Sequence, residues 1–96
     1  MKFDDAASCL EVLGNPTRLK IYRLLVRAGA DGMAVGRLQE KLDTAGSTLS
    51  HHLKGLIGTG LITQTREGTT LICRSNDGRL RDVVDYLVKE CGADLR

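Results

Sequence analysis

The chain has 96 residues, of which 42% are hydrophobic, 27% are charged and 3% are aromatic, with a formal net charge of +2. This length predicts one domain over residues 1–96, the balanced composition argues against disorder, and no apolar run reaches the roughly 20 residues that span a bilayer. The scarcity of aromatic side chains excludes a platform for stacking single-stranded bases, and a chain this small gains stability from a partner subunit.

Apolar residues at helical spacing predict two helices in the first third of the chain. The first contains Phe3 and Leu13, and we expect it to end at the glycine that follows. The pair Asn15-Pro16 indicates a helix N-cap followed by proline at the first helical position, so a second helix is expected over residues 16–28. A glycine-rich turn at residues 29–32 separates it from the next element.

The next segments predict a helix-turn-helix followed by a β-hairpin. A short third helix is expected over residues 35–42 and, after a brief turn, a fourth over residues 47–59. Residues 61–66 and 69–74 are then rich in β-branched side chains, and Glu67-Gly68 between them indicates the hairpin turn. A last helix carries an apolar stripe that comprises Leu80, Val83, Val84, Leu87, Val88 and Cys91. The order α-α-α-α-β-β-α, mainly helical with a small hairpin (α+β), is that of a winged helix-turn-helix.

The fourth helix presents a polar face of the kind that a recognition helix needs. At about 100° per residue, His51 points almost opposite to the apolar face, which is expected to consist of Leu49, Leu53, Leu56 and Ile57. Short donors and acceptors with a cation suit base edges and phosphates in a major groove, although an isolated helix often exposes such a face to solvent. Because this helix is the second helix of a helix-turn-helix and precedes a hairpin, we interpret its polar face as a DNA contact rather than as an ordinary solvent-exposed face. The predicted DNA contacts are Ser47, Thr48, Ser50, His51, His52 and Lys54, with Arg66 and Thr69 from the hairpin.

Residue spacing and the absence of catalytic motifs argue against several other functions. His51 and His52 are adjacent, so their side chains point about 100° apart and cannot chelate one metal ion. No glycine-rich phosphate loop, HExxH motif or nucleophile–base set is present, so we expect no enzyme and no required cofactor. With no apolar signal segment behind Met1, we expect a cytoplasmic protein.

Three segments together resemble the ArsR/SmtB family of bacterial repressors. They are LGNPTRLKIYRLL (13–25), STLSHHLKGLIGTGLI (47–62) and REGTTLICR (66–74). The resemblance implies a homodimer that binds a palindromic operator in double-stranded DNA, is released by an inducer, and forms its dimer interface from the first and last helices. The wide apolar stripes of both helices agree with such an interface. The residues that we place in it are Leu10, Leu80, Val84, Leu87 and Val88.

The sequence departs from the family pattern at two positions. Family members commonly have serine at the position of Ala45, so the cap of the fourth helix is expected from Asp43 or Thr44 instead. In a branch with a cysteine at the end of the hairpin, a Cys-Cys pair ends the last helix, and Gly92 replaces the second of these cysteines here.

The cysteines are the candidates for an inducer site. Two common metal sites of the family are not matched: the helix before the recognition helix has no cysteine, and the last helix has Asp82 and Asp85 but no histidine. The resemblance to the branch just described implies that Cys73 and Cys91 bind trivalent arsenic or an organoarsenical, with Cys9 as a third thiolate for arsenite. Two alternatives stay open: a redox switch that closes a disulfide, and a regulator without a small-molecule sensor. Free cysteines are also ordinary buried residues.

Overall fold

The computed structural model describes residues 1–92. Its elements are α1 (Phe3–Leu13), α2 (Pro16–Ala28), η1 (Gly29–Asp31), β1 (Met33–Ala34), α3 (Val35–Leu42), α4 (Gly46–Gly58), β2 (Ile62–Glu67), β3 (Thr70–Ser75), α5 (Asp77–Tyr86) and η2 (Leu87–Cys91). The turn η1 is a 3₁₀-helix, and η2 is a π-helical turn that continues α5. The predicted order of helices and strands is confirmed, with β1 added to it.

The strand β1 was missed because two residues carry no alternating pattern. It pairs with β3, so the hairpin becomes a three-stranded antiparallel sheet in the order β1-β3-β2. Gly32 makes the approach possible, since its φ is 69° and a Cβ there would overlap the carbonyl oxygen of Cys73. This pairing attaches the base of the hairpin to the segment that leads into α3.

The hairpin loop lies one residue later than predicted. Glu67 pairs with Thr70, so the loop consists of Gly68 and Thr69, and the prediction of a turn at Glu67-Gly68 is wrong. Glu67 stays in the strand because its carboxylate accepts a hydrogen bond from Nη2 of Arg74 on β3, at 2.9 Å. Gly68 has a φ of 66° whereas the φ of Thr69 is not positive, and this combination is characteristic of a type II′ turn.

The helix α2 starts as its sequence predicts. The side-chain oxygen of Asn15 accepts hydrogen bonds from the backbone N–H groups of Thr17, at 2.9 Å, and Arg18, at 3.1 Å. Pro16 occupies the first helical position, where its missing N–H costs nothing. The cap fixes where α2 begins and therefore which of its faces meets α4.

The start of α4 differs from the expectation. The helix begins at Gly46 with Ala45 as N-cap, and no side chain caps it. The prediction that Asp43 or Thr44 supplies the cap is wrong. Asp43 has a φ of 48° and ends α3 in the left-handed region, so its side chain does not reach the first turn of α4.

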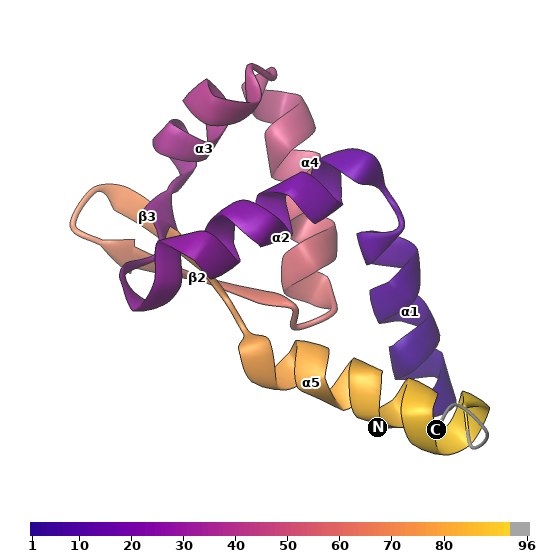
Figure 1. Ribbon diagram of the computed structural model, residues 1–96. Coiled ribbons are helices and arrows are strands. Elements are labelled where there is room, and N and C mark those ends of the chain that lie inside the picture. Colours follow the sequence, from indigo (N-terminus) through magenta and orange to yellow (C-terminus); the bar gives the residue numbers. More distant parts are fainter. Residues whose placement is uncertain (93–96) are drawn as a thin grey trace.

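All five α-helices and the sheet contribute to one core. The fully buried side chains include Cys9, Ile21, Leu25, Leu38, Leu49, Leu56, Leu61, Ile62, Cys73 and Val83. In Figure 1 the hairpin of β2 and β3 extends on the side away from α1, and α5 runs from the end of β3 toward α1. Among residues 1–92 no helix is long and apolar enough to cross a membrane. The core holds α4 rigidly while leaving its outer face free.

The hydroxyl of Tyr22 is a buried polar group without a partner in the described part of the chain. Burial raises the pKa of Tyr22, and the nearby Asp77 carboxylate raises it further. Because an unsatisfied buried hydroxyl costs free energy, Tyr22→Phe is expected to raise the free energy of unfolding by about 1 kcal/mol in urea titrations. Tyr86→Phe on α5 is the matched control. A Tyr22→Phe chain that is less stable than the parent would contradict this prediction.

Candidate nucleic-acid interface

The outward face of α4 is polar and accessible. Leu49, Leu53 and Leu56 are buried and anchor the helix in the core. The exposed side chains on the other side are Ser47, Thr48, Ser50, His51 and Lys54, whereas His52 is partly buried. The helical period predicts the faces of α4 correctly except at Ile57, which was expected on the apolar face and is 38% exposed. Contact of the polar face with DNA stays a prediction.

His52 connects α4 to α2. Nε of Arg18 donates a hydrogen bond to Nδ1 of His52 at 3.2 Å. Burial lowers the pKa of His52, and the positive charges of Arg18 and His51 lower it further. The ring is therefore neutral at pH 7, and its proton sits on Nε2 because Nδ1 is the acceptor. The sequence did not identify Arg18 as a residue of this site because its hydrogen-bond partner, His52, lies 34 residues away.

The lowered pKa of His52 predicts a loss of stability in mild acid. The unfolded chain binds a proton near pH 6.5 while the folded chain does not, so the free energy of unfolding should fall as pH drops below that value. His52→Gln removes the titrating group and keeps an acceptor for Arg18, so its decline should be shallower. Denaturant unfolding at pH 7.5, 6.5 and 5.5 measures this, with His51→Gln as control. Equal declines in parent and His52→Gln would contradict it.

The hairpin presents Arg66 and Thr69 to solvent, whereas Arg74 is half-buried and bonded to the protein itself. Nε of Arg74 donates to the carbonyl oxygen of Ala30 at 2.8 Å, and Nη1 donates to Oγ1 of Thr65 at 2.9 Å. A third bond joins it to Glu67 and is the main reason why the pKa of that carboxyl is lowered. Arg74 thus fixes the wing to η1, and Arg66 is the wing cation that remains for a ligand.

The structure separates the three cysteines. Cys9 is buried on α1, where Sγ donates to the carbonyl oxygen of Thr59 at 3.7 Å. Cys73 is buried on β3, accepts from Nε2 of Gln64 at 3.5 Å, and has its pKa raised by burial. Cys91 is exposed at the end of η2.

The distances along the fold keep two of these thiols apart within one chain. Figure 1 shows β3 and the yellow C-terminal turns at opposite ends of α5. The 15 residues from Asp77 to Cys91 span about 21 Å of helix. One chain in this conformation does not present Cys73 and Cys91 to a single metalloid. Within residues 1–92 no cluster of three or more His, Cys, Asp or Glu side chains could hold a metal ion.

The residues predicted for the dimer interface fall into two groups. Leu10, Val84 and Val88 are outward, with 42%, 49% and 52% of their surface exposed. Leu80 and Leu87 are partly buried and pack against the core of their own chain. The outward group is therefore the part of the stripe that a second subunit can cover.

The three-helix unit of α2, α3 and α4, followed by the paired strands β2 and β3, defines a winged helix-turn-helix DNA-binding protein. Residues 13–65, more than half of the chain, match the family profile described as a helix-turn-helix domain.

Proteins that are similar in sequence over nearly the whole chain identify the family within this class. An uncharacterized HTH-type transcriptional regulator of Methanocaldococcus jannaschii is 32% identical, covering 86% of this chain and 91% of its own length. The arsenical resistance operon repressor of Staphylococcus xylosus is 29% identical, covering 91% and 77%. A Mycobacterium bovis structure, described as a homodimeric winged helix-turn-helix DNA-binding domain of a possible ArsR-family regulator, is 29% identical with a TM-score of 0.73, covering 88% and 77%. The chain belongs to the ArsR/SmtB family of winged helix-turn-helix transcriptional regulators, which bind DNA and are not enzymes.

Proposed function

We propose that this protein is a homodimeric repressor that binds a palindromic operator with one α4 helix per subunit. The observation that carries the proposal is the exposed polar face of α4, which lies opposite three buried leucines and beside the wing. In a symmetric dimer the two helices enter successive major grooves about 34 Å apart, so the half-sites are expected about one helical turn apart.

Different side chains are expected to contact the bases and the phosphates of the operator. Ser47, Thr48 and His51 point outward from the first turns of α4 and are placed to contact base edges. Lys54, further along the helix, and Arg66 on the wing are cations suited to phosphates. The remaining predicted contacts are Ser50, His52 and Thr69.

Selection of random DNA duplexes by the purified protein tests the proposal. We expect enrichment of an inverted repeat whose half-sites lie about 10 base pairs apart, and a footprint that covers both. Failure to enrich any sequence, or enrichment of a single half-site, would overturn the dimeric operator model.

The dimer is proposed to form through α1 and α5, where Leu10, Val84 and Val88 are exposed. The homodimeric description of the Mycobacterium bovis relative supports a dimer of two copies. Burial of these side chains removes apolar surface from water, which at about 25 cal/mol per Å² favours association.

We further propose that the inducer is thiol-reactive and that a trivalent arsenical is its chemical class. The name of the Staphylococcus xylosus relative, an arsenical resistance operon repressor, supports this. Cys91 is the exposed thiol and is therefore the first to bind. Recruitment of Cys73 requires a rearrangement of β3, because this thiol is fully buried in the core and about 21 Å of helix separates the end of β3 from Cys91 within one chain. Such a rearrangement would disturb the wing and weaken the complex with DNA.

Mass spectrometry of the reduced protein tests the order of these steps. With arsenite or methylarsenite, we expect a first adduct that disappears in Cys91→Ser and persists in Cys9→Ala, since Cys9 is buried. Operator release should require Cys91. An arsenical that binds Cys91→Ser normally would contradict the assignment. Release by peroxide with a disulfide would favour the redox alternative, and release by neither reagent would favour a regulator without a sensor.

A further inference from the structure

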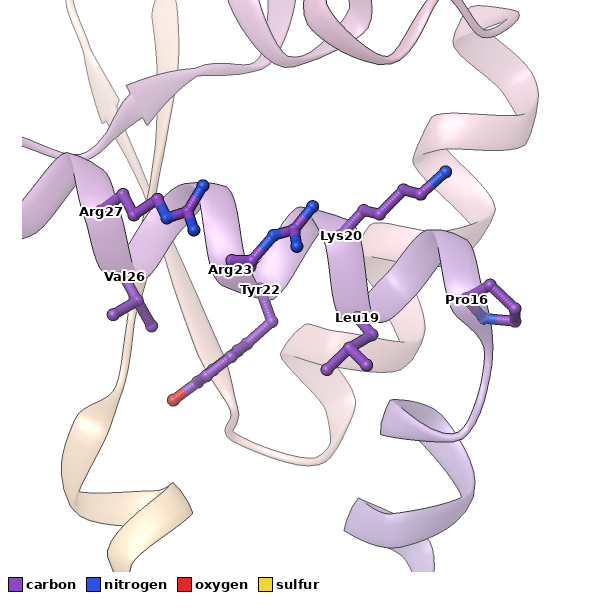
Figure 2. Close-up of a pocket in the computed structure, with 7 residues that line it drawn as sticks. All are labelled: Pro16, Leu19, Lys20, Tyr22, Arg23, Val26 and Arg27. Atoms are coloured by element: carbon purple, nitrogen blue, oxygen red, sulfur yellow. The ribbon is translucent and has the colours of Figure 1, made fainter.

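A shallow apolar groove runs along the outer face of α2. Its volume is about 590 Å³ and it is lined by residues of α2 from Pro16 to Arg27. Figure 2 shows Leu19, Tyr22 and Val26 pointing to one side of the helix, into the space bordered by α1 and α5. Leu19 is 53% exposed and Val26 is 45% exposed, so the rest of the chain covers this face only at the buried Tyr22.

One edge of the groove is positively charged. Lys20, Arg23 and Arg27 line it and point to the other side of α2 in Figure 2. The helix contains no acidic residue, and among residues 1–92 none of these three cations has an ion-pair partner. An occupant with an apolar ridge and a row of carboxylates would match both features.

The outer face of α1 has this complementary pattern. Phe3, Ala7 and Leu10 recur at i, i+4 and i+7 and are all exposed, Phe3 at 70%. Asp4 and Glu11 lie one step around the helix and form an acidic edge along this stripe. Phe3 and Leu10 are seven residues apart, as are Leu19 and Val26 on α2, and the edge of α1 is acidic where the edge of α2 is basic.

The outer face of α1 cannot occupy the groove of its own chain. Ala6 and Cys9 on the opposite face of α1 are buried in the core, which turns Phe3 and Leu10 away from it. The occupant that carries the matching surface is therefore α1 of a second copy.

The exposed apolar residues support a continuous surface. Seven of the eight large exposed hydrophobic residues in the described chain lie on α1, α2, α5, η2 or at the N-terminus: Met1, Phe3, Leu10, Leu19, Val26, Val84 and Val88. The groove on α2 is thus an extension of the interface proposed for α1 and α5. A large unbroken apolar surface on a soluble protein marks an interaction site.

We propose that α1 of a second copy lies along the groove of α2, with Phe3 and Leu10 against Leu19 and Val26 and its acidic edge beside Arg23 and Arg27. The inference rests on the proposed homodimer and adds α2 to its interface. Since Arg18 of α2 also holds His52 of α4, the partner then docks on the helix that positions the recognition helix. A change in how the partner packs on α2 would therefore be transmitted by α2 to α4.

Charge-swapped chains test the proposal. The acidic chain carries Arg23→Glu and Arg27→Glu, and the basic chain carries Asp4→Lys and Glu11→Lys. Each alone places like charges across the contact, so its self-association measured by sedimentation should weaken at least about tenfold. Mixed together, they should form the heterodimer in preference to both homodimers, as measured by native mass spectrometry. Arg37→Glu on α3 reverses a charge away from the groove and should leave dimerisation unchanged.

The outcomes separate this inference from the proposed function. A mixture that pairs at the statistical ratio, while each chain still dimerises like the parent and selects an operator, would overturn the α2 contact and leave the repressor intact. Loss of operator affinity in the acidic chain with unchanged dimerisation would assign the cations to DNA and also overturn it. Rescue only in the mixture supports it, because a contact within one chain would not be restored by mixing.

Discussion

A Val84→Asp chain is expected to sediment as a monomer and to bind its operator at least about 100-fold more weakly than the parent. Val84 is 49% exposed on α5, so the substitution should leave the fold unchanged but place a carboxylate in the apolar interface. A monomer binds each half-site separately and loses the gain from linking the two recognition helices, which is typically about 10²–10⁴. Sedimentation and operator titration measure the two effects on the same sample.

The control for this substitution lies on the same helix. Asp82→Asn changes the charge of α5 by one on the face opposite Val84 and should leave both the dimer and operator affinity near those of the parent. Circular dichroism checks that Val84→Asp keeps its helices. A Val84→Asp chain that remains dimeric would remove α5 from the interface, and a monomer with full operator affinity would show that one recognition helix suffices.

The local signals of the sequence predicted most of the elements because each has a short-range cause. The Asn15 side chain and Pro16 define the start of α2, and both act within three residues. The buried face of α4 follows from leucines at helical spacing, which is why Ser47 and His51 were placed outward correctly. Periodicity is sufficient wherever one element faces one core.

The features that escaped prediction depend on contacts between distant segments. The pairing of β1 with β3 joins Met33 to Cys73, and this pairing is what buries the Cys73 thiol that the family resemblance suggested as a sensor. The bonds of Arg74 to η1 and β2 also join distant segments, and nothing in the local sequence indicates them. The start of α4 at Gly46 also had no side-chain signal, because no side chain caps it.

Charge pattern and fold together explain how a chain with a net charge of only +2 can bind DNA. Seven of the twelve acidic residues lie on α1, α5 and η2, whereas α4 contains none and has Lys54 as its charged residue. Separation of charge within the molecule, rather than its sum, gives the local field that attracts phosphates.

Substitutions on the recognition helix and on the wing are expected to have different effects. His51→Ala should reduce preference for the operator over random DNA by about 1–3 kcal/mol per half-site, because it removes a contact to a base edge. Arg66→Ala should weaken binding to all sequences. It should also reduce the slope of log affinity against log salt concentration by about two for the dimer, because each subunit loses one phosphate contact. Arg66 is the suitable wing position because it is exposed, whereas Arg74 is held by Ala30, Thr65 and Glu67.

Titration of operator and random duplexes at several salt concentrations separates the two effects. Arg37→Ala is the matched control, since this exposed arginine on α3 pairs with Glu40 at 3.2 Å and is not among the predicted contacts. If His51→Ala and Arg66→Ala weakened binding to random DNA equally and with the same change in salt slope, the division between base recognition by α4 and backbone contact by the wing would be wrong. If only Arg66→Ala altered operator preference, sequence recognition would have to move to the wing.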